Sequence, residues 1–153
     1  MDDYKVNKDR FYVTLFLLDG STKEGFIYLS SHAARHEGPE FVIDVLRQSE
    51  QFLPINLKDG STPIINKDQI LMMSFPSENG ETVEFPSGER TVHEVVVHLE
   101  NHDKVEGRFI SVLPDHAQRV KDFLNQKEPF LELIKDEGIY LINKVHVVFV
   151  EEK

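Results

Sequence analysis

The residues most able to bind a metal ion lie in the stretch "SHAARHEGPE" at 31–40. They are His32, His36, Glu37 and Glu40. Two histidines four residues apart on a helix can bind zinc when a third ligand approaches. The glycine-proline pair at 38–39 interrupts such a helix, however, and the second half of the chain has no similar cluster. The pattern therefore favours an exposed loop, with metal-assisted chemistry at His32, His36 and Glu40 as an alternative.

A second histidine pair occurs in "VHLENH" at 97–102. Leu99 belongs to the buried side of an alternating strand, so His98 is expected to face outward, because successive strand side chains point to opposite faces. His102 falls at the following turn. Both histidines are therefore predicted to be surface residues.

The sequence has no pattern for covalent catalysis or phosphate binding. It has no cysteine, no serine in a G-x-S-x-G context and no glycine-rich phosphate loop. The carboxylate pairs at 136–137 and 151–152 fit a turn and a chain end better than an acid-base couple. We therefore predict a non-enzymatic protein with no catalytic residue, cofactor or metal.

Composition and charge narrow the classes of partner. Hydrophobic residues make up 40% of the 153 residues and charged ones 29%, which is typical of a globular protein. No apolar run approaches the roughly 18 residues of a membrane span, and the start "MDDYKVNKDR" lacks the order of a signal peptide, so the expected location is the cytoplasm. The net charge of -10 disfavours nucleic acid, since nonspecific binding to phosphates depends on cationic side chains.

The secondary-structure elements that position these side chains are expected to occur twice, because the sequence repeats itself. "PIINKDQI" at 63–70 resembles "YLINKVHV" at 140–147. "VTLFLLDGSTKEGFI" at 13–27 aligns without a gap with "VVVHLENHDKVEGRF" at 95–109. The order of the matching segments is preserved, which is the pattern of a duplicated supersecondary unit.

The offset between the matching residues falls along the chain as the connections shorten. Gly25 matches Gly107 at an offset of 82 residues. Phe52 matches Phe130 at 78, and the Ile-Asn-Lys at 65–67 matches that at 142–144 at 77. The order of the segments is therefore preserved while the short connections between them shrink.

Each unit is predicted to contain the same elements. Alternating Val13, Leu15 and Leu17 indicate a strand with one buried face, and Asp19-Gly20 a tight hairpin turn. A helix is expected over 39–48, with a counterpart over 114–126, because apolar residues recur at helical spacing. Two more strands follow in each unit. They are expected within 51–57, 62–75, 129–135 and 138–150.

A segment rich in Gly, Pro, Ser and Glu separates the units at 75–90. Such residues interrupt periodic segments, so we divide the chain into residues 1–76, a linker 77–90 and residues 91–153. Units of about 70 residues are marginal as isolated domains. The two units are therefore expected to share a core.

The hairpin and the last strands resemble the two signatures of Sm-like proteins. Residues 17–27 read L-x-D-G-x4-G-x-I, as in the first Sm signature. "INKDQI" (65–70) and "INKVHV" (142–147) resemble the second, I-R-G-x-x-I, with Asn-Lys in place of Arg-Gly. The resemblance, which extends to uncharacterised bacterial Sm-like proteins, implies two tandem small barrels or bent sheets, each with one inserted helix, packed as an internal pseudo-dimer.

The resemblance also implies where a ligand would bind. In RNA-binding Sm proteins the Arg-Gly and an earlier Asp and Asn line the nucleotide pocket. Here a helix is predicted after the hairpin, and the candidates for a ligand or RNA are Asn66, Lys67, Asn143 and Lys144. Turn chemistry favours a structural role for these four residues. Sm-like units also associate through strand edges, which a fused pair could instead satisfy internally.

Two strands that are apolar on both faces suggest an interaction surface. They are 70–75 and 147–150. Candidate surface residues are Phe16, Leu18, Met73 and Phe75. These strands could be buried against the helices and between the units, or they could bind a partner, a second copy or an added strand.

The sequence therefore predicts an α+β, β-rich protein acting as a non-enzymatic binding or scaffolding module, with a protein as its expected partner and self-association possible. RNA binding and metal binding are the alternatives.

Overall fold

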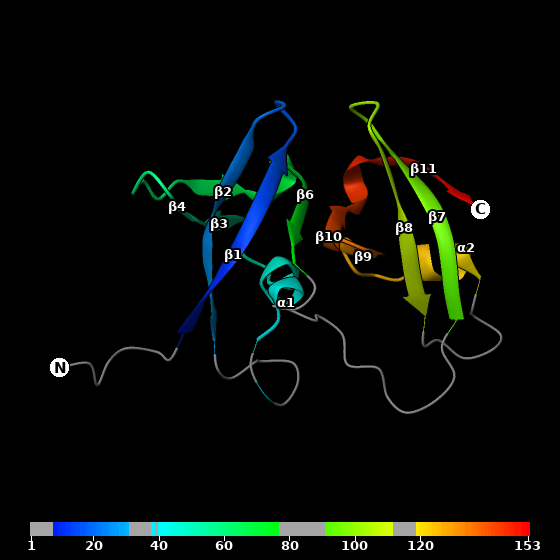
Figure 1. Cartoon of the computed structure of the whole chain (residues 1–153), viewed down its shortest axis with the longest axis horizontal. Coiled ribbons are helices and arrows are strands. Elements are labelled where there is room, and N and C mark those ends of the chain that lie inside the picture. The colour runs from blue at the N-terminus through cyan, green and yellow to red at the C-terminus, as the bar shows by residue number, and fades with distance from the viewer. Residues whose placement is uncertain (1–7, 31–37, 39, 77–90, 112–118) are drawn as a thin grey trace.

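The computed structural model describes residues 8–30, 38, 40–76, 91–111 and 119–153 (Figure 1). The predicted linker 77–90 lies outside the described residues, and so do His32, His36 and Glu37. Within the described part, strands dominate and the only α-helices are α1 (Val42–Arg47) and α2 (Val120–Leu124). The predicted β-rich α+β class is confirmed.

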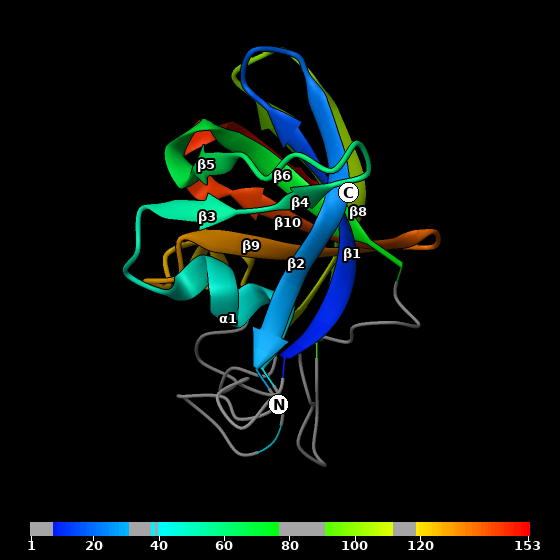
Figure 2. The same ribbon diagram turned by 90° about the vertical axis from the view of Figure 1, so that its left-hand side faces the viewer.

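The described residues 8–76, here called the N-terminal half, contain six strands. These are β1 (Lys8–Leu17), β2 (Thr22–Ser30), β3 (Phe52–Pro54), β4 (Asn56–Leu57), β5 (Ile64–Asn66) and β6 (Ile70–Phe75). The 3₁₀ turn η1 (Lys67–Gln69) connects β5 to β6. Figure 2 views the molecule from this half, with β2, β3, β4 and α1 toward the viewer.

The described residues 91–153, the C-terminal half, contain five strands. These are β7 (Thr91–Leu99), β8 (Lys104–Ser111), β9 (Phe130–Lys135), β10 (Gly138–Asn143) and β11 (Val147–Glu152). A 3₁₀ turn, η4 (Lys144–His146), connects β10 to β11.

Nine strands form one sheet in the order β11-β7-β8-β9-β10-β6-β1-β2-β4, and β3 pairs with β5 in a second sheet. The sheets are open, so the closed-barrel form of the sequence expectation is wrong. A closed barrel has no edge strand. In the described chain β11 ends the large sheet, and β5 pairs on one side only.

The two halves are joined by the antiparallel pairing of β10 with β6, which we call the junction. Leu141 lies opposite Met73 there, and Ile139 lies opposite Phe75. Figure 1 shows β6 and β10 at the centre, between the two halves. The sheet is therefore continuous from one half to the other.

The predicted hairpins form as their patterns indicate. Val13 and Leu15 are buried on β1, as are Val95 and Val97 on β7, which confirms the alternation. At the first turn Gly20 has a φ of 89°, where glycine is favoured because it has no Cβ. His102 holds the corresponding position with a φ of 74°.

Helix α1 is shorter than the predicted 39–48, and α2 occupies Val120–Leu124 of the predicted 114–126, of which 114–118 lie outside the described residues. Helix α1 begins after Phe41, whose backbone N–H donates to Asp44 Oδ2 at 2.7 Å. At its other end the ammonium of Lys67 binds the carbonyl oxygens of Val45 and Gln48. The helix therefore ends where a lysine from outside the helix takes its last carbonyl groups.

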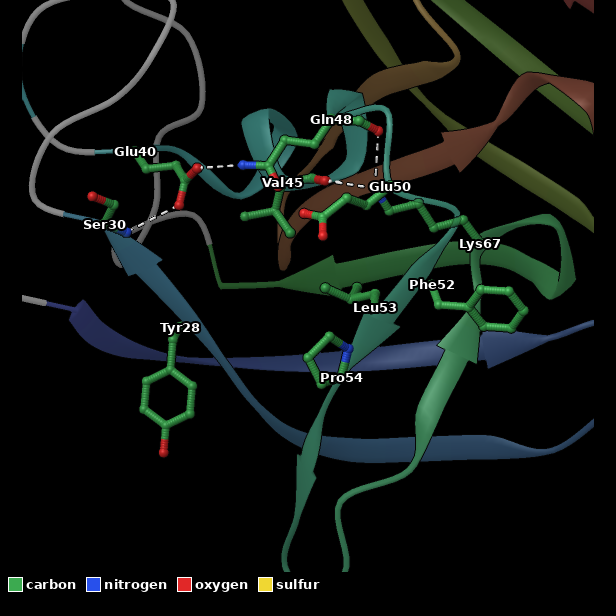
Figure 3. A pocket seen from close by; sticks show the side chains of 10 residues that line it. All are labelled: Tyr28, Ser30, Glu40, Val45, Gln48, Glu50, Phe52, Leu53, Pro54 and Lys67. Atoms are coloured by element: carbon green, nitrogen blue, oxygen red, sulfur yellow. Dashed lines mark hydrogen bonds between the residues drawn. The ribbon is translucent and has the colours of Figure 1, made fainter. Parts of the chain in front are cut away.

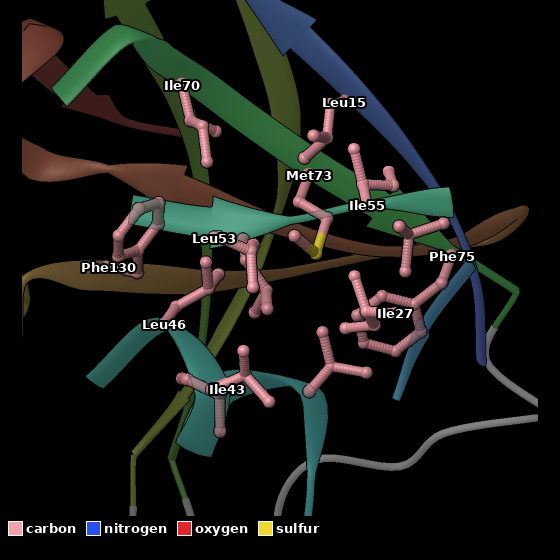
Figure 4. Packing of buried hydrophobic residues seen from close by; sticks show 14 of the residues in the cluster. Leu15, Ile27, Ile43, Leu46, Leu53, Ile55, Ile70, Met73, Phe75 and Phe130 are labelled. Atoms are coloured by element: carbon pink, nitrogen blue, oxygen red, sulfur yellow. The ribbon is translucent and has the colours of Figure 1, made fainter. Parts of the chain in front are cut away.

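Each hydrophobic cluster contains residues from both halves. The first, built mainly from the N-terminal half, includes Phe130, Ile139 and Leu141. Figure 4 shows Phe130 beside Leu46 within this cluster. The second, built mainly from the C-terminal half, includes Leu71 and Met72 of β6. The cores are therefore completed across the junction.

In the part of the chain that the structure describes, neither helix has the length or the apolar surface to cross a bilayer.

Candidate functional site

The two Asn-Lys pairs stand at the strand-to-strand turns η1 and η4. Asn66 Oδ1 accepts a hydrogen bond from the Asp68 N–H at 3.1 Å, and Asn143 Oδ1 accepts one from the Val145 N–H at 3.4 Å. Each asparagine therefore caps a 3₁₀ turn with its side-chain oxygen, as turn chemistry predicts.

The two lysines bind backbone carbonyls. Lys67 is buried, and its Nζ lies 2.9 Å from Val45 O and 3.1 Å from Gln48 O. Lys144 Nζ donates to Gln126 O. Burial lowers the pKa of both lysines from the ordinary value of 10.5. Their ammonium groups hold the chain's own backbone in place.

The two asparagines differ in what their amide nitrogens contact. Asn143 Nδ2 reaches across the junction and donates to Lys67 O at 3.2 Å and to Ile70 O at 3.0 Å. Asn66 Nδ2 has no such acceptor among the described residues, although its Oδ1 also accepts from Gln51 Nε2 at 2.8 Å. Asn143 is buried, while Asn66 stands at the outer edge of β5.

The four residues proposed as an interaction surface are not equally accessible. Met73 and Phe75 are buried, because β10 pairs with their strand and covers it. Phe16 and Leu18 are partly buried against the second hydrophobic cluster. Met73 and Phe75 therefore belong to the interior, which corrects their assignment to an exposed surface.

Of the predicted metal candidates His32, His36, Glu37 and Glu40, only Glu40 lies among the described residues. Among the described residues no three His, Cys, Asp or Glu side chains form a group able to hold an ion. Glu40 accepts hydrogen bonds from Ser30 N–H at 3.0 Å and Gln48 Nε2 at 2.7 Å. His98 Nε2 lies 2.6 Å from Glu151 Oε1, and its ring stacks on Phe149. His98 is therefore partly covered by β11 and not fully exposed.

A cavity of about 420 Å³ lies beside α1 and β3 (Figure 3). Lys67 reaches the rim of this cavity, but its two short contacts go to carbonyl oxygens at the end of α1. Glu40 is occupied by Ser30 and Gln48, as the dashed lines show. Lys67 and Glu40 therefore stabilise the cavity wall and the helix through these contacts.

Several exposed large apolar side chains of the described chain lie along two strand edges, while Val145, which is 67% exposed, lies in the turn η4. Ile64 is 66% exposed and Phe52 55% on the β5–β3 side, and Val148 is 62% exposed and Phe149 50% on β11. In the described chain, no strand pairs with the outer edge of β5 or of β11, and we call these the two open edges. The sequence pattern marked β11 as needing cover, but it did not point to Ile64 or Phe52.

Comparison with known proteins gives no match, whether with family models, with curated proteins or with solved structures.

Proposed function

We propose that the protein is a non-enzymatic binding or scaffolding module, built from two tandem Sm-like units, that binds protein strands along its two open edges. The observation that carries the proposal is the row of exposed apolar side chains on edge strands. An exposed, apolar edge strand is a template for pairing with another chain, and proteins that do not use such edges usually protect them.

The backbone of β5 presents hydrogen-bonding groups to the open edge. Ile55 N–H donates to Pro63 O at 3.1 Å, and Lys67 N–H donates to Gln51 O at 2.9 Å, so these residues of the β5 segment face β3. Backbone groups alternate in direction along a strand, so those of Ile64 turn outward. Pro63, which lacks an N–H, therefore does not block the outer edge.

The backbone of β11 also presents hydrogen-bonding groups to an open edge, on the opposite side of the molecule. Lys153 N–H donates to Glu94 O at 2.9 Å, toward β7. By the same alternation, the backbone groups of Glu152 and Val150 point away from β7, in the part of β11 between its end and the register shift at Val147–Phe149. Each edge thus combines unpaired main-chain groups with exposed apolar side chains, which is what strand addition requires.

The tandem-unit part of the proposal is supported by the order of strand pairing. In the N-terminal half β6 pairs with β1, β1 with β2, and β2 with β4, while β3 pairs with β5. In the C-terminal half β11 pairs with β7, β7 with β8, β8 with β9, and β9 with β10. The β3–β4 segment thus takes the place of β9.

RNA binding through the Asn-Lys pairs has less support. Nonspecific affinity for phosphate depends on cationic side chains that can approach the backbone. Lys67 and Lys144 bind carbonyl oxygens instead, and the chain has a net charge of -10.

The proposal is tested by selecting displayed random peptides against dilute, immobilised protein. We expect extended, apolar-alternating peptides whose binding is lost in the variant Ile64→Glu or Val148→Glu, because a charge at an edge opposes strand addition. The matched control is Val92→Glu, which alters an exposed valine near the start of β7 that lies opposite Ile110 of β8 and outside the pairing of β7 with β11. Selected peptides that bind all three variants equally would contradict the proposal.

A further inference from the structure

We infer that the protein binds a small, uncharged, polyhydroxylated ring of the monosaccharide class in a second cavity, where β1, β6 and β10 meet at the junction. This cavity has a volume of about 230 Å³. Drug-sized ligands occupy cavities of roughly 300 Å³ or more, so this one has room for a single small ring. The inference goes beyond the proposed function, because neither open edge contributes to the cavity.

Three side-chain hydroxyl groups lie in one row across the strands that line the cavity. Thr14 of β1 lies opposite Ser74 of β6, and Ser74 lies opposite Tyr140 of β10. Residues directly opposite one another on neighbouring strands share a face of the sheet, so these side chains are neighbours. All three are partly buried, and none of their hydroxyl groups has a hydrogen-bond partner in the part of the chain that the structure describes. Because each hydroxyl can both donate and accept, the row suits a ligand with several hydroxyl groups of its own.

Two tyrosine rings add aromatic surface to the same cavity. They belong to Tyr12 and Tyr140. Phe26 packs edge-on against the Tyr12 ring, with the centroids 5.2 Å apart, and Lys58 Nζ lies 5.0 Å from the Tyr12 centroid. Lys135 Nζ lies 5.0 Å from the centroid of Tyr140. A sugar ring has an apolar face made of its C–H groups, which can pack on an aromatic ring. Rings that are already held by their neighbours lose little freedom when a ligand binds, which favours affinity.

The charged groups around the cavity are balanced, which favours an uncharged ligand. Lys135 Nζ lies 3.2 Å from Glu137 Oε1, and Glu137 lines the cavity. Lys58 Nζ lies 3.6 Å from Glu24 Oε2. Each lysine beside a tyrosine ring thus has a carboxylate of its own. A charged ligand would therefore lose water without finding an unpaired ion of opposite sign.

The row of hydroxyl groups is not part of the duplicated pattern. The pair Thr14–Ser74 corresponds to Val96 of β7 and Glu151 of β11, which lie opposite one another in the same way. There a valine replaces the threonine, and a carboxylate bound to His98 replaces the serine hydroxyl. The same strand pairing therefore forms without the hydroxyl groups, which leaves them free to serve a ligand.

The test is a titration of the full-length, ¹⁵N-labelled chain with single sugars, followed by amide NMR. The probes are D-glucose, D-galactose, D-ribose and myo-inositol, and the comparison compound is tetrahydropyran, a ring without hydroxyl groups. Each is added to about 50 mM, well above the roughly millimolar dissociation constant of a ligand this small. We expect saturable shifts at the residues that line the cavity with at least one hydroxylated probe, and none with tetrahydropyran.

Side-chain variants then test the hydroxyl row itself. Thr14→Val, Ser74→Ala and Tyr140→Phe each remove a hydroxyl group and keep most of the side chain. We expect each to weaken binding about fivefold or more, the value of roughly one hydrogen bond, with little change in thermal unfolding. The matched control is Tyr28→Phe, which removes a tyrosine hydroxyl on β2 outside this cavity and should bind like the wild type. Tyr12→Ala, verified as folded by circular dichroism, should abolish binding.

Three results would overturn the inference. The first is the absence of a saturable shift with every hydroxylated probe. The second is a set of shifts that tetrahydropyran reproduces or that lie away from the cavity, because binding would then not depend on hydroxyl groups at this place. The third is wild-type affinity in all three hydroxyl variants, because the row of hydroxyl groups would then have no role in binding.

Discussion

At the residue scale, the two lysines show how the same sequence motif serves one purpose in two settings. Lys67 and Lys144 each follow an asparagine at the start of a 3₁₀ turn, and each reaches a carbonyl oxygen that follows or ends a short helix. Lys67 is buried and has two carbonyl partners, whereas Lys144 is only partly buried and has one. Removing the Lys67 side chain should therefore lower the free energy of unfolding more than removing that of Lys144.

We predict that Lys67→Ala lowers the free energy of unfolding by about 2 kcal/mol, because buried carbonyl acceptors would lose their donor. Lys144→Ala, the matched control, should cost less than about 1 kcal/mol, since its acceptor lies near water. Urea unfolding of both variants measures the difference. If both variants lost the same stability, the burial of Lys67 would not increase the contribution of its hydrogen bonds to the free energy of unfolding.

The difference in free energy of unfolding between the wild type and Lys67→Ala should change with pH in one direction. Burial lowers the pKa of Lys67 in the folded state below the ordinary value of 10.5. The charged form is therefore disfavoured by folding, and the wild type gains stability relative to Lys67→Ala as the pH rises from the folded pKa toward the ordinary value. If the stability advantage of the wild type over Lys67→Ala shrank over this pH range, burial would not be the cause of the lowered pKa.

At the element scale, two matching glycines permit the close crossing of neighbouring strands. A Cβ on Gly25 of β2 would lie 2.2 Å from Asn56 O of β4. A Cβ on Gly107 of β8 would lie 2.7 Å from Leu133 Cγ of β9 and 2.8 Å from Ile134 O. The repeated E-G at these positions thus has a packing cause in both halves.

We predict that Gly25→Ala destabilises the protein by about 3 kcal/mol and Gly107→Ala by about 2 kcal/mol, because overpacking forces the backbone to shift. The order follows from the nearest atom, which is a backbone oxygen for Gly25 and a side-chain carbon for Gly107. Thermal unfolding compares them with Glu24→Ala and Glu106→Ala, exposed neighbours that should change stability little. If the alanine variants at 25 and 107 unfold like these controls, the crossings are looser than described.

The sequence predicts the helices and strands better than it predicts which of them are buried by neighbouring elements. Aspartate-glycine turns and alternating strands are local signals, and the hairpin of β1 and β2 forms where they place it. Helix α1 is shorter than predicted because Asp44 and Lys67 fix its ends through contacts that periodicity does not encode. The second helix begins at Val120, after residues that lie outside the described part.

The candidate site could be predicted only in part, because local sequence patterns do not show which strand another strand covers. Strands β6 and β11 are both apolar on both faces, and their sequences do not say which one another strand covers. β6 is covered by β10, so Met73 becomes interior, while β11 keeps Val148 exposed. Ile64 is identified by its exposure on the outer edge of β5, which only the structure shows.

At the scale of the whole molecule, the two halves depend on one another for a complete core. Phe130, Ile139 and Leu141 belong to the first cluster although they come from the C-terminal half. Leu71 and Met72 belong to the second cluster although they come from the N-terminal half. The halves are therefore expected to unfold as one cooperative unit and not as two domains.

This expectation leads to a prediction for the separated halves. Residues 1–76 alone would expose Met73 and Phe75, which are buried at the junction, and residues 91–153 alone would expose Leu141. Because chains of this length bury a core only marginally, we expect neither fragment to give a dispersed amide NMR spectrum by itself, and an equimolar mixture to recover one. A fragment that unfolds cooperatively alone would show that its core needs no residues from across the junction, and the junction would then be an association of two finished domains.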